Sequence, residues 1–189
     1  MNTQAVEVQV WDPWVRLFHW GLVILVLVTL TTGDHLLKLH VLAGHGILGL
    51  VLFRLVWGFV GTKHALFRDF LFSPSHIFKH LKTMTGGIQE RYLGHNPAGG
   101  IMIIILITLL TLLCISGLLM LDTERGVGIL EGVTATIPIF MARWMEDIHE
   151  ALGALLWLLI VLHLGGVILE SWLHGENLVW SMITGKKRS

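Results

Sequence analysis

Charged residues and cysteine are both scarce in this chain of 189 residues. Lys, Arg, Asp and Glu make up 14% of the sequence, whereas soluble domains carry about 25%. The single cysteine, Cys114, excludes an internal disulfide framework, an iron–sulfur cluster held by several thiolates and a covalent C-x-x-C-H haem site. The formal net charge is zero, so no overall field favours nucleic acid or another highly charged partner.

Long apolar runs fill most of the remaining sequence. Hydrophobic residues make up 54% of the chain, and its mean hydropathy is +0.74. A helix that crosses a bilayer needs about 20 apolar residues, and four segments are long enough. No A-x-A cleavage site follows the first one, so we interpret it as a true span rather than a signal peptide. The sequence predicts an all-α integral membrane protein, one membrane domain over residues 1–189 with spans over 14–33, 40–61, 99–121 and 148–169.

Prolines that follow a short polar residue mark three expected helix starts. Asp12-Pro13 and Asn96-Pro97 precede the first and third spans, because such side chains cap free amides and proline suits the first helical position. Ser73-Pro74 opens a shorter segment, 74–84, whose apolar and basic residues predict a helix lying along the membrane surface. A polar loop is the alternative for this segment.

The distribution of Lys and Arg predicts the orientation, because cytoplasmic flanks are enriched in both. The N-terminal flank, the loop between spans two and three and the C-terminal tail carry nine, namely Arg16, Lys63, Arg68, Lys79, Lys82, Arg91, Lys186, Lys187 and Arg188. The two loops on the other side carry three, namely Lys38, Arg125 and Arg143. We therefore expect both termini in the cytoplasm.

The eleven histidines divide into two groups. Six fall in loops or at span ends, where we expect solvated or headgroup-level side chains: His35, His64, His76, His80, His95 and His174. Five lie within spans or at their mouths: His19, His40, His45, His149 and His163. Ionisable groups inside a membrane are costly and indicate a functional site by default.

His149 and His163 lie fourteen positions apart on the fourth span. At 3.6 residues per turn they face the same side of the helix and are separated by about 21 Å along its axis. This spacing favours two flat macrocycles stacked across the bilayer, with one imidazole of this helix bound to each iron.

Each iron then needs a second imidazole from another span at the same depth. With the orientation above, His19 matches His163 (the inner pair) and His40 matches His149 (the outer pair). The third span contains no histidine. Hydrogen-bonded histidines packed between helices are the alternative for this set.

A glycine spacing favours His40 over His45 in the outer pair. His40 and His149 both occur in the pattern H-x-x-x-G, with Gly44 and Gly153 one turn deeper on the same face. A glycine there leaves room for a ring to lie against the backbone. His45 is about 140° around the helix from His40, so the two cannot serve one site, and His45 remains the alternative ligand.

Arg54 interrupts the second span fourteen residues after His40, so it faces the inner site. An unpaired arginine at that depth costs several kcal/mol, roughly 3 or more. A haem propionate would supply the counter-charge, and Arg16, three residues before His19, is placed to do the same. Snorkelling of Arg54 to the cytoplasmic headgroups is the alternative.

The chain resembles the prokaryotic cytochrome b561 family, which includes the b-type cytochrome subunit of membrane-bound nickel–iron hydrogenases. The resemblance is carried by WDPWVRLFHW, HVLAGHGILGLVLFRLVWGFVG, RYLGHNPAGG, HEALGALLWLLIVLHLGGV and SWLHGENLVWSMITGKKR. It implies a four-helix membrane bundle in a bacterial cytoplasmic membrane with two non-covalent haems b. Its bis-histidine ligands match His19, His40, His149 and His163, and the histidine at position 45 departs from the family pattern.

A bis-histidine haem has no open position for substrate and suits electron transfer. We therefore expect an electron-transfer subunit of a quinone-linked oxidoreductase, connecting the quinone pool to a periplasmic hydrogenase, dehydrogenase or c-type cytochrome. The acidic residues beside His149 either help such a partner dock or form a solvated mouth: Glu146, Asp147 and Glu150. Quinone is expected near the inner haem, beside the polar end of the fourth span: Glu170, His174, Glu176 and Asn177.

Two other functions are compatible with the sequence. One is a stand-alone quinone-linked oxidoreductase that acts on superoxide or a ferric chelate at the outer haem. The other is a histidine-lined proton or metal transporter, although transporters usually gather polar groups at one midplane site. The expected partners are membrane lipid, quinone and a periplasmic redox protein but not nucleic acid, and a homodimer is compatible with the sequence.

Overall fold

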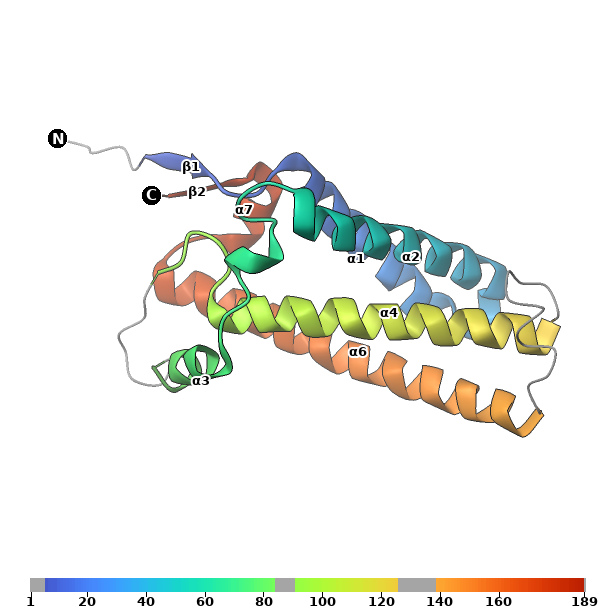
Figure 1. The fold of residues 1–189 in the computed structure, drawn as a ribbon. Helices are drawn as coiled ribbons and strands as arrows, with labels where there is room; N and C mark the ends of the chain where they lie inside the picture. Colours follow the sequence, from blue (N-terminus) through green and yellow to red (C-terminus); the bar gives the residue numbers. More distant parts are fainter. Residues whose placement is uncertain (1–5, 84–90, 126–138, 189) are drawn as a thin grey trace. The chain divides into compact units, whose positions relative to one another are not determined.

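Four long helices dominate the computed structural model, which describes residues 6–83, 91–125 and 139–188 (Figure 1). Each is long and apolar enough to cross a membrane. This confirms the predicted all-α membrane class. The helices start earlier or end later than the predicted spans, because helical hydrogen bonding continues into the polar flanks. They are α1 (Pro13–Thr32), α2 (Leu37–Val60), α4 (Pro97–Arg125) and α6 (Ile139–His174).

Shorter elements connect the long helices and close the two ends of the chain. A 3-10 turn, η1 (Gly33–Leu36), joins α1 to α2, and a second, η2 (Phe67–Asp69), follows α2. The remaining elements are α3 (Pro74–Thr83), α7 (Leu178–Thr184), β1 (Glu7–Gln9) and β2 (Lys186–Arg188). The strands β1 and β2 pair antiparallel with Val8 opposite Lys187, so segments from the first ten and the last ten residues lie side by side (Figure 1).

The segment predicted to lie along the membrane surface is helical where the structure describes it. It forms α3, with residue 84 outside the described residues. Phe78 is 73% exposed on this helix, beside the exposed Lys79. An exposed aromatic ring next to a cation suits a headgroup layer, and the surface location of α3 stays a prediction.

The chain packs as two compact units, and each long helix contributes residues to both. The first unit comprises Met1–Trp20, Phe53–Ile105 and Val161–Ser189. The second comprises Gly21–Leu52 and Leu106–Ile160. Of the predicted iron ligands, His19 and His163 belong to the first unit and His40 and His149 to the second. Each predicted pair therefore lies within one unit.

The core of the first unit joins the residues after β1, the start of α1 and the segment that follows α2. Val10, Trp11, Val15 and Ala65 are buried together, and Trp57 packs against them. The amides of Val10 and Trp11 both donate to the carbonyl of Gly185. These bonds anchor the N-terminal segment on the segment that follows α7.

Two glycines allow close approaches that shape the first unit. Gly58 lies directly against the ring of Phe67, and Gly100 lies against the backbone oxygen of Phe70. A β-carbon at either position would collide with these atoms. Backbone cannot move aside as a flexible side chain can, so Gly100 fixes where Phe70 lies against α4.

Exposed apolar side chains occur on all four long helices. Examples are Ile24 at 61%, Leu42 at 69%, Leu112 at 47% and Ile168 at 69% exposed. Single exposed apolar residues are normal in soluble proteins. Their number here, on helices with few charges, agrees with surfaces that face lipid.

Asp12 caps α1 as the sequence predicts, and it also binds the segment after α2. Its Oδ1 accepts from the amides of Trp14 and Val15, at 2.8 and 2.9 Å. Its Oδ2 accepts from Trp57 Nε1 at 3.2 Å and Thr62 Oγ1 at 2.6 Å. Burial by itself raises the pKa of Asp12, yet these hydrogen bonds outweigh it and the pKa lies below its ordinary value of 3.8.

We expect acid to weaken the first unit through Asp12. Because the folded-state pKa is lowered, its stabilisation is present above pH 3.8 and is lost as the pH falls through the folded-state pKa. Replacing Asp12 with Ala should lower the free energy of unfolding by about 1–2 kcal/mol at neutral pH. Thermal unfolding in detergent between pH 7 and pH 3 measures both effects. An Asp12→Ala variant that loses stability with acid as steeply as wild type would contradict the assignment.

Candidate cofactor site

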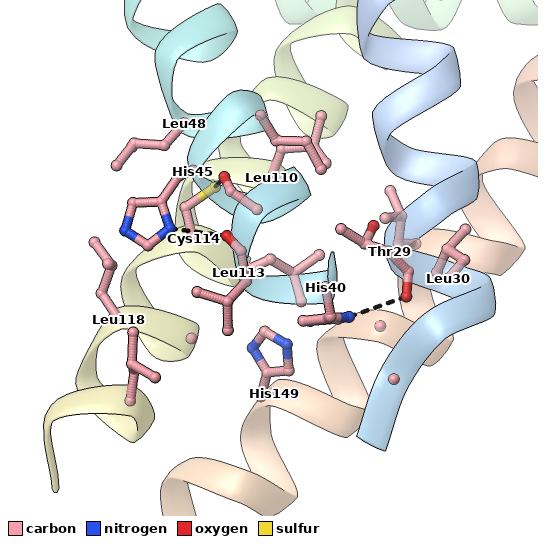
Figure 2. Close-up of a pocket in the computed structure, with 18 of the residues that line it drawn as sticks. Thr29, Leu30, His40, His45, Leu48, Leu110, Leu113, Cys114, Leu118 and His149 are labelled. Atoms are coloured by element: carbon pink, nitrogen blue, oxygen red, sulfur yellow. Dashed lines mark hydrogen bonds between the residues drawn. The ribbon is translucent and has the colours of Figure 1, made fainter. Parts of the chain in front are cut away.

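His40 of α2 and His149 of α6 face each other across a cavity in the second unit. The cavity has a volume of about 340 Å³, and its wall is mainly leucine and glycine. The two ring centroids are 6.1 Å apart, and the ring planes are inclined by 69°. Figure 2 shows the two imidazoles side by side, approaching from different helices. The structure therefore brings together the two histidines of the predicted outer pair.

The hydrogen bonds of these rings fix which nitrogen carries the proton. His40 Nδ1 lies 3.1 Å from the carbonyl oxygen of Thr29, which can only accept, so this nitrogen donates. His149 Nδ1 lies 2.8 Å from Ser116 Oγ. The Ser116 hydroxyl already donates to the carbonyl of Leu113 at 3.1 Å, so it accepts from His149. Both rings are thus held as Nδ1–H tautomers with an Nε2 lone pair free, the arrangement typical of metal-bound histidine.

Sequence reasoning missed Thr29 and Ser116 as partners of the two rings. The available signal was a hydroxyl residue within an otherwise apolar span, which rarely occurs there without a hydrogen-bond partner. Their pairing with histidines eleven and thirty-three positions away follows only from the packing of the helices.

The glycines predicted to make room beside the rings do border the cavity. Gly44 and Gly153 both line it, and a β-carbon at either would meet nothing within 4 Å. Gly117, which sequence reasoning did not identify, lies closer, because its β-carbon would be 3.3 Å from His149 Cε1. Three helices therefore present a bare backbone to the cavity.

His45 also borders the cavity but is held differently from His40. Its Nδ1 lies 2.8 Å from the carbonyl oxygen of Val41, one turn earlier on the same helix, and the residue is exposed. Figure 2 shows its ring beside Leu48, apart from the ring of His149. The geometry favours His40 as the partner of His149.

The second-unit site fits a metal macrocycle better than a bare metal ion. Within the described residues, no group of three or more His, Cys, Asp or Glu side chains is arranged to hold a metal ion. Structural and catalytic zinc sites use three or four protein ligands. A metal that brings its own ring of nitrogen ligands, as haem iron does, needs only two. Metal–nitrogen bonds of about 2 Å to each imidazole keep ring centroids roughly 6 Å apart, close to the observed separation.

His19 and His163 of the predicted inner pair both belong to the first unit. Both are half-buried, and His163 lies close enough for its charge, when protonated, to act on His19. His19 Nδ1 is buried without a hydrogen-bond partner. The His19 ring packs edge-on against Trp20, with centroids 5.2 Å apart, and the indole of Trp20 donates to the carbonyl of Met182 at 3.4 Å. This site therefore has two imidazoles and an unsatisfied buried donor.

Arg54 is enclosed by protein, with only 3% of the residue exposed. Its Nη2 donates to the carbonyl of Ala65 at 2.9 Å, and its guanidinium lies 4.9 Å from the ring centroid of Phe67 and 5.8 Å from that of Phe70. Its Nη1 is buried without a partner. Snorkelling to the headgroups does not describe this side chain, whose free donor points into the first unit.

Arg16 has one bonded and one unbonded donor. Its Nη1 donates to the carbonyl of Ile183 at 2.6 Å, whereas its Nε is buried without a partner. The structure thus places both arginines that the sequence assigns to propionates in the unit that holds His19 and His163, each with a spare donor.

Two of the loop histidines expected to be solvated or at headgroup level, His80 and His95, are partly or fully enclosed by the protein. His80 is only 6% exposed. The His95 ring packs against Trp11 and Phe70, with centroid distances of 4.5 and 4.9 Å, and its Nδ1 is buried without a partner. Burial lowers the pKa of His95 to about 3, so the ring is neutral at physiological pH. Both histidines flank glycine-rich or basic segments, which gave no apolar periodicity to indicate burial.

The polar residues at the end of α6 are largely engaged in bonds of their own. Glu170 pairs with His174 at 3.3 Å. Glu176 pairs with Arg91 at 3.3 Å and accepts from the amide of Arg188 at 2.9 Å. Glu176 also borders an open cavity of about 460 Å³ together with Asn177, which caps α7. Glu176 and Asn177 therefore face a space large enough for a ligand ring.

The acidic residues beside His149 are all exposed: Glu146, Asp147 and Glu150. Glu150 also borders the second-unit cavity. A docking surface and a solvated mouth both agree with this exposure.

Comparison with known proteins gives one family. A family model described as prokaryotic cytochrome b561 matches residues 10–185. No curated protein and no solved structure matches the chain significantly. The matched region contains all four long apolar helices and both histidine pairs.

Proposed function

The chain belongs to the prokaryotic cytochrome b561 family, and from that premise we propose that it carries electrons between the quinone pool and a periplasmic redox partner. Membership makes it an integral membrane protein that binds b-type haem and takes part in electron transfer. The proposal adds two haems b, held by the outer and inner pairs, a quinone as exchangeable substrate, and a bacterial cytoplasmic membrane with both termini inside.

The single observation that carries the proposal is the outer pair. His40 and His149 face each other at 6.1 Å, and both have their Nδ1 protons committed to Thr29 and Ser116. Both Nε2 atoms are therefore available to one iron. A haem held by two imidazoles supplies reversible one-electron transfer without an open coordination position. The residues of the chain hold both rings in place and line the site with apolar side chains that exclude water.

The inner pair supports a second haem in the first unit. His19 and His163 would supply its two ligands. Arg16 and Arg54 would bind its propionates through the donors that have no protein partner. A buried guanidinium without an anion is unfavourable, and a carboxylate satisfies both its charge and its hydrogen-bonding capacity.

The charge distribution and one cavity of the chain support a quinone site at one end of the electron path and a protein partner at the other. The Lys and Arg distribution supports a position of the inner pair near the cytoplasm. The open cavity beside Glu176 and Asn177 belongs to the same unit as this pair and suits a quinone ring. The exposed acidic residues beside His149 suit a basic patch on a periplasmic hydrogenase, dehydrogenase or c-type cytochrome.

Absorption spectroscopy of the purified chain tests this function. We expect a reduced-minus-oxidised spectrum with a b-type α-band, two haems per chain, and reduction of both by a quinol analogue. A ratio of one haem per chain would contradict the two-site proposal. Fast turnover of superoxide or a ferric chelate by the chain alone would instead identify a stand-alone oxidoreductase. Absence of any haem would favour a transporter and contradict the family assignment itself.

A further inference from the structure

Apart from the ring nitrogen of His19, three buried donors in the described part of the first unit have no hydrogen-bond partner. They are Arg16 Nε, Arg54 Nη1 and His95 Nδ1. More than about nine in ten buried polar groups in native proteins are satisfied. Leaving one unsatisfied costs about 1–3 kcal/mol, and more for a charged group. Several in one unit indicate an acceptor that is not part of the protein. His95 is the one donor among them with no role in the proposal above.

The charged surroundings of His95 indicate that this acceptor is an anion. The groups whose charges interact with His95 are Arg54, Lys187, His64 and His163. Every one is a cation or can become one, and no described carboxylate is among them. The Trp11 and Phe70 rings pack against the half-buried imidazole, which limits the water that can screen these charges.

Two acidic groups that act on these cations, Asp12 on Arg54 and Glu176 on Lys187, have hydrogen-bond partners of their own. All four hydrogen bonds to the Asp12 carboxylate come from Trp14, Val15, Trp57 and Thr62. Glu176 binds Arg91 and the amide of Arg188. Neither carboxylate has a hydrogen bond to Arg54 Nη1 or His95 Nδ1, since both of these atoms are without a partner.

Arg54 and His95 approach the same side chain. The guanidinium of Arg54 lies 5.8 Å from the ring centroid of Phe70, and the imidazole of His95 lies 4.9 Å from it, edge to face. The two side chains come from α2 and from the segment before α4, and each lies beside the ring of Phe70 with an N–H group that has no partner. One planar acceptor with two oxygens can bridge two such groups. A carboxylate has this shape.

We propose that His95 and Arg54 together bind one carboxylate of the haem held by His19 and His163. This inference rests on the proposed function, and it adds a binding residue that lies outside the four apolar helices. His95 donates its Nδ1 proton as a neutral imidazole, and Arg54 supplies the positive charge. The phosphate of an anionic phospholipid has similar chemistry and is the competing source of the anion.

When a carboxylate loses one of its hydrogen-bond donors, less of its negative charge is compensated, and the electrostatic potential that it produces at the iron becomes more negative. The ferric state is then favoured, and the midpoint potential of that haem falls. Two donors on one acceptor also depend on each other, so the effects of removing them are not additive. A purely structural role for His95 would change stability but would leave the potential where it is.

The experiment uses the full-length, haem-loaded chain and follows both haems by spectroelectrochemical titration. We expect His95→Phe, which keeps the ring and removes the donor, to lower the potential of one haem and leave the other unchanged. His95→Gln, which keeps an N–H donor, should restore most of the shift. His95→Phe combined with Arg54→Met should shift the potential by less than the sum of the single shifts. His76→Phe, on the exposed face of α3 in the same unit, is the matched control and should change neither potential.

Redox-difference infrared spectroscopy with haem labelled with ¹³C at its carboxylates provides a second readout. The carboxylate band of wild type should move in His95→Phe and, by a smaller amount, in His95→Gln. Unchanged potentials together with an unchanged band would overturn the proposal, and so would co-purifying anionic phospholipid that the Phe variant loses while both potentials stay constant. If the His95→Phe variant does not accumulate, the position of the same carboxylate band is compared between wild type and His95→Gln, and a shift between these two supports the proposal. Absence of haem from wild type would instead refute the proposed function.

Discussion

Replacing His149 with alanine is expected to remove the outer haem completely and to halve the haem content of the purified chain. His40→Ala should give the same product, because the two rings face each other at 6.1 Å and the outer iron would take one imidazole from each. The haem that remains should keep the spectrum and potential of the inner site. Pyridine haemochrome assay per chain and redox titration of the α-band measure both outcomes.

Two further variants make this prediction specific to the outer pair. His45→Ala should retain both haems, since its ring is held by Val41 one turn away. Ser116→Ala should keep the ligand but release its orientation, with a loss of about 10–100-fold in haem affinity, as expected for a group that fixes a metal-bound histidine. If His45→Ala loses the outer haem while His40→Ala retains it, the assignment of His40 fails.

His163→Ala and His19→Ala are expected to remove the other haem and leave the outer one intact. The reason is the grouping of their side chains in the first unit, together with both arginines that have spare donors. A chain carrying both His149→Ala and His163→Ala should hold no haem at all. Haem content, together with the potential of the haem that remains, distinguishes these variants from His40→Ala and His149→Ala.

His174 is the matched control for the inner pair. It lies on α6 eleven residues after His163, and it pairs with Glu170 at 3.3 Å. His174→Ala should therefore retain both haems. Loss of the same haem from His163→Ala and His149→Ala would show that the two histidines do not serve separate irons, and the two-site proposal would then fail.

The ligand variants and the His95 variants test different properties of the haem-loaded chain. Ligand replacement changes how many haems are bound, whereas removal of the His95 donor changes the potential of one bound haem. A chain that binds haem normally but shows no effect of His95→Phe would keep the proposed function and lose the further inference.

The sequence by itself determined the class of the protein and predicted the pairing of its histidines. Four apolar runs of sufficient length can only be satisfied as membrane helices, because helices bond their own backbone groups. Once a segment is a helix, its 3.6-residue period fixes which residues share a face. From that period alone, His149 and His163, fourteen residues apart, are expected on one face of their helix. The same holds for His40 with Gly44 and for His149 with Gly153.

The tertiary structure decided everything that depends on contacts between distant parts of the chain. No periodicity links Ser116 to His149, Thr29 to His40 or Arg54 to the carbonyl of Ala65, because each contact depends on how separate elements pack. The pairing of β1 with β2 and the burial of His95 between Trp11 and Phe70 are of the same kind. Helical geometry is a local property of the backbone and can be read along the chain. Hydrogen-bond partners and burial are set by the three-dimensional packing of side chains, which the order of residues does not display.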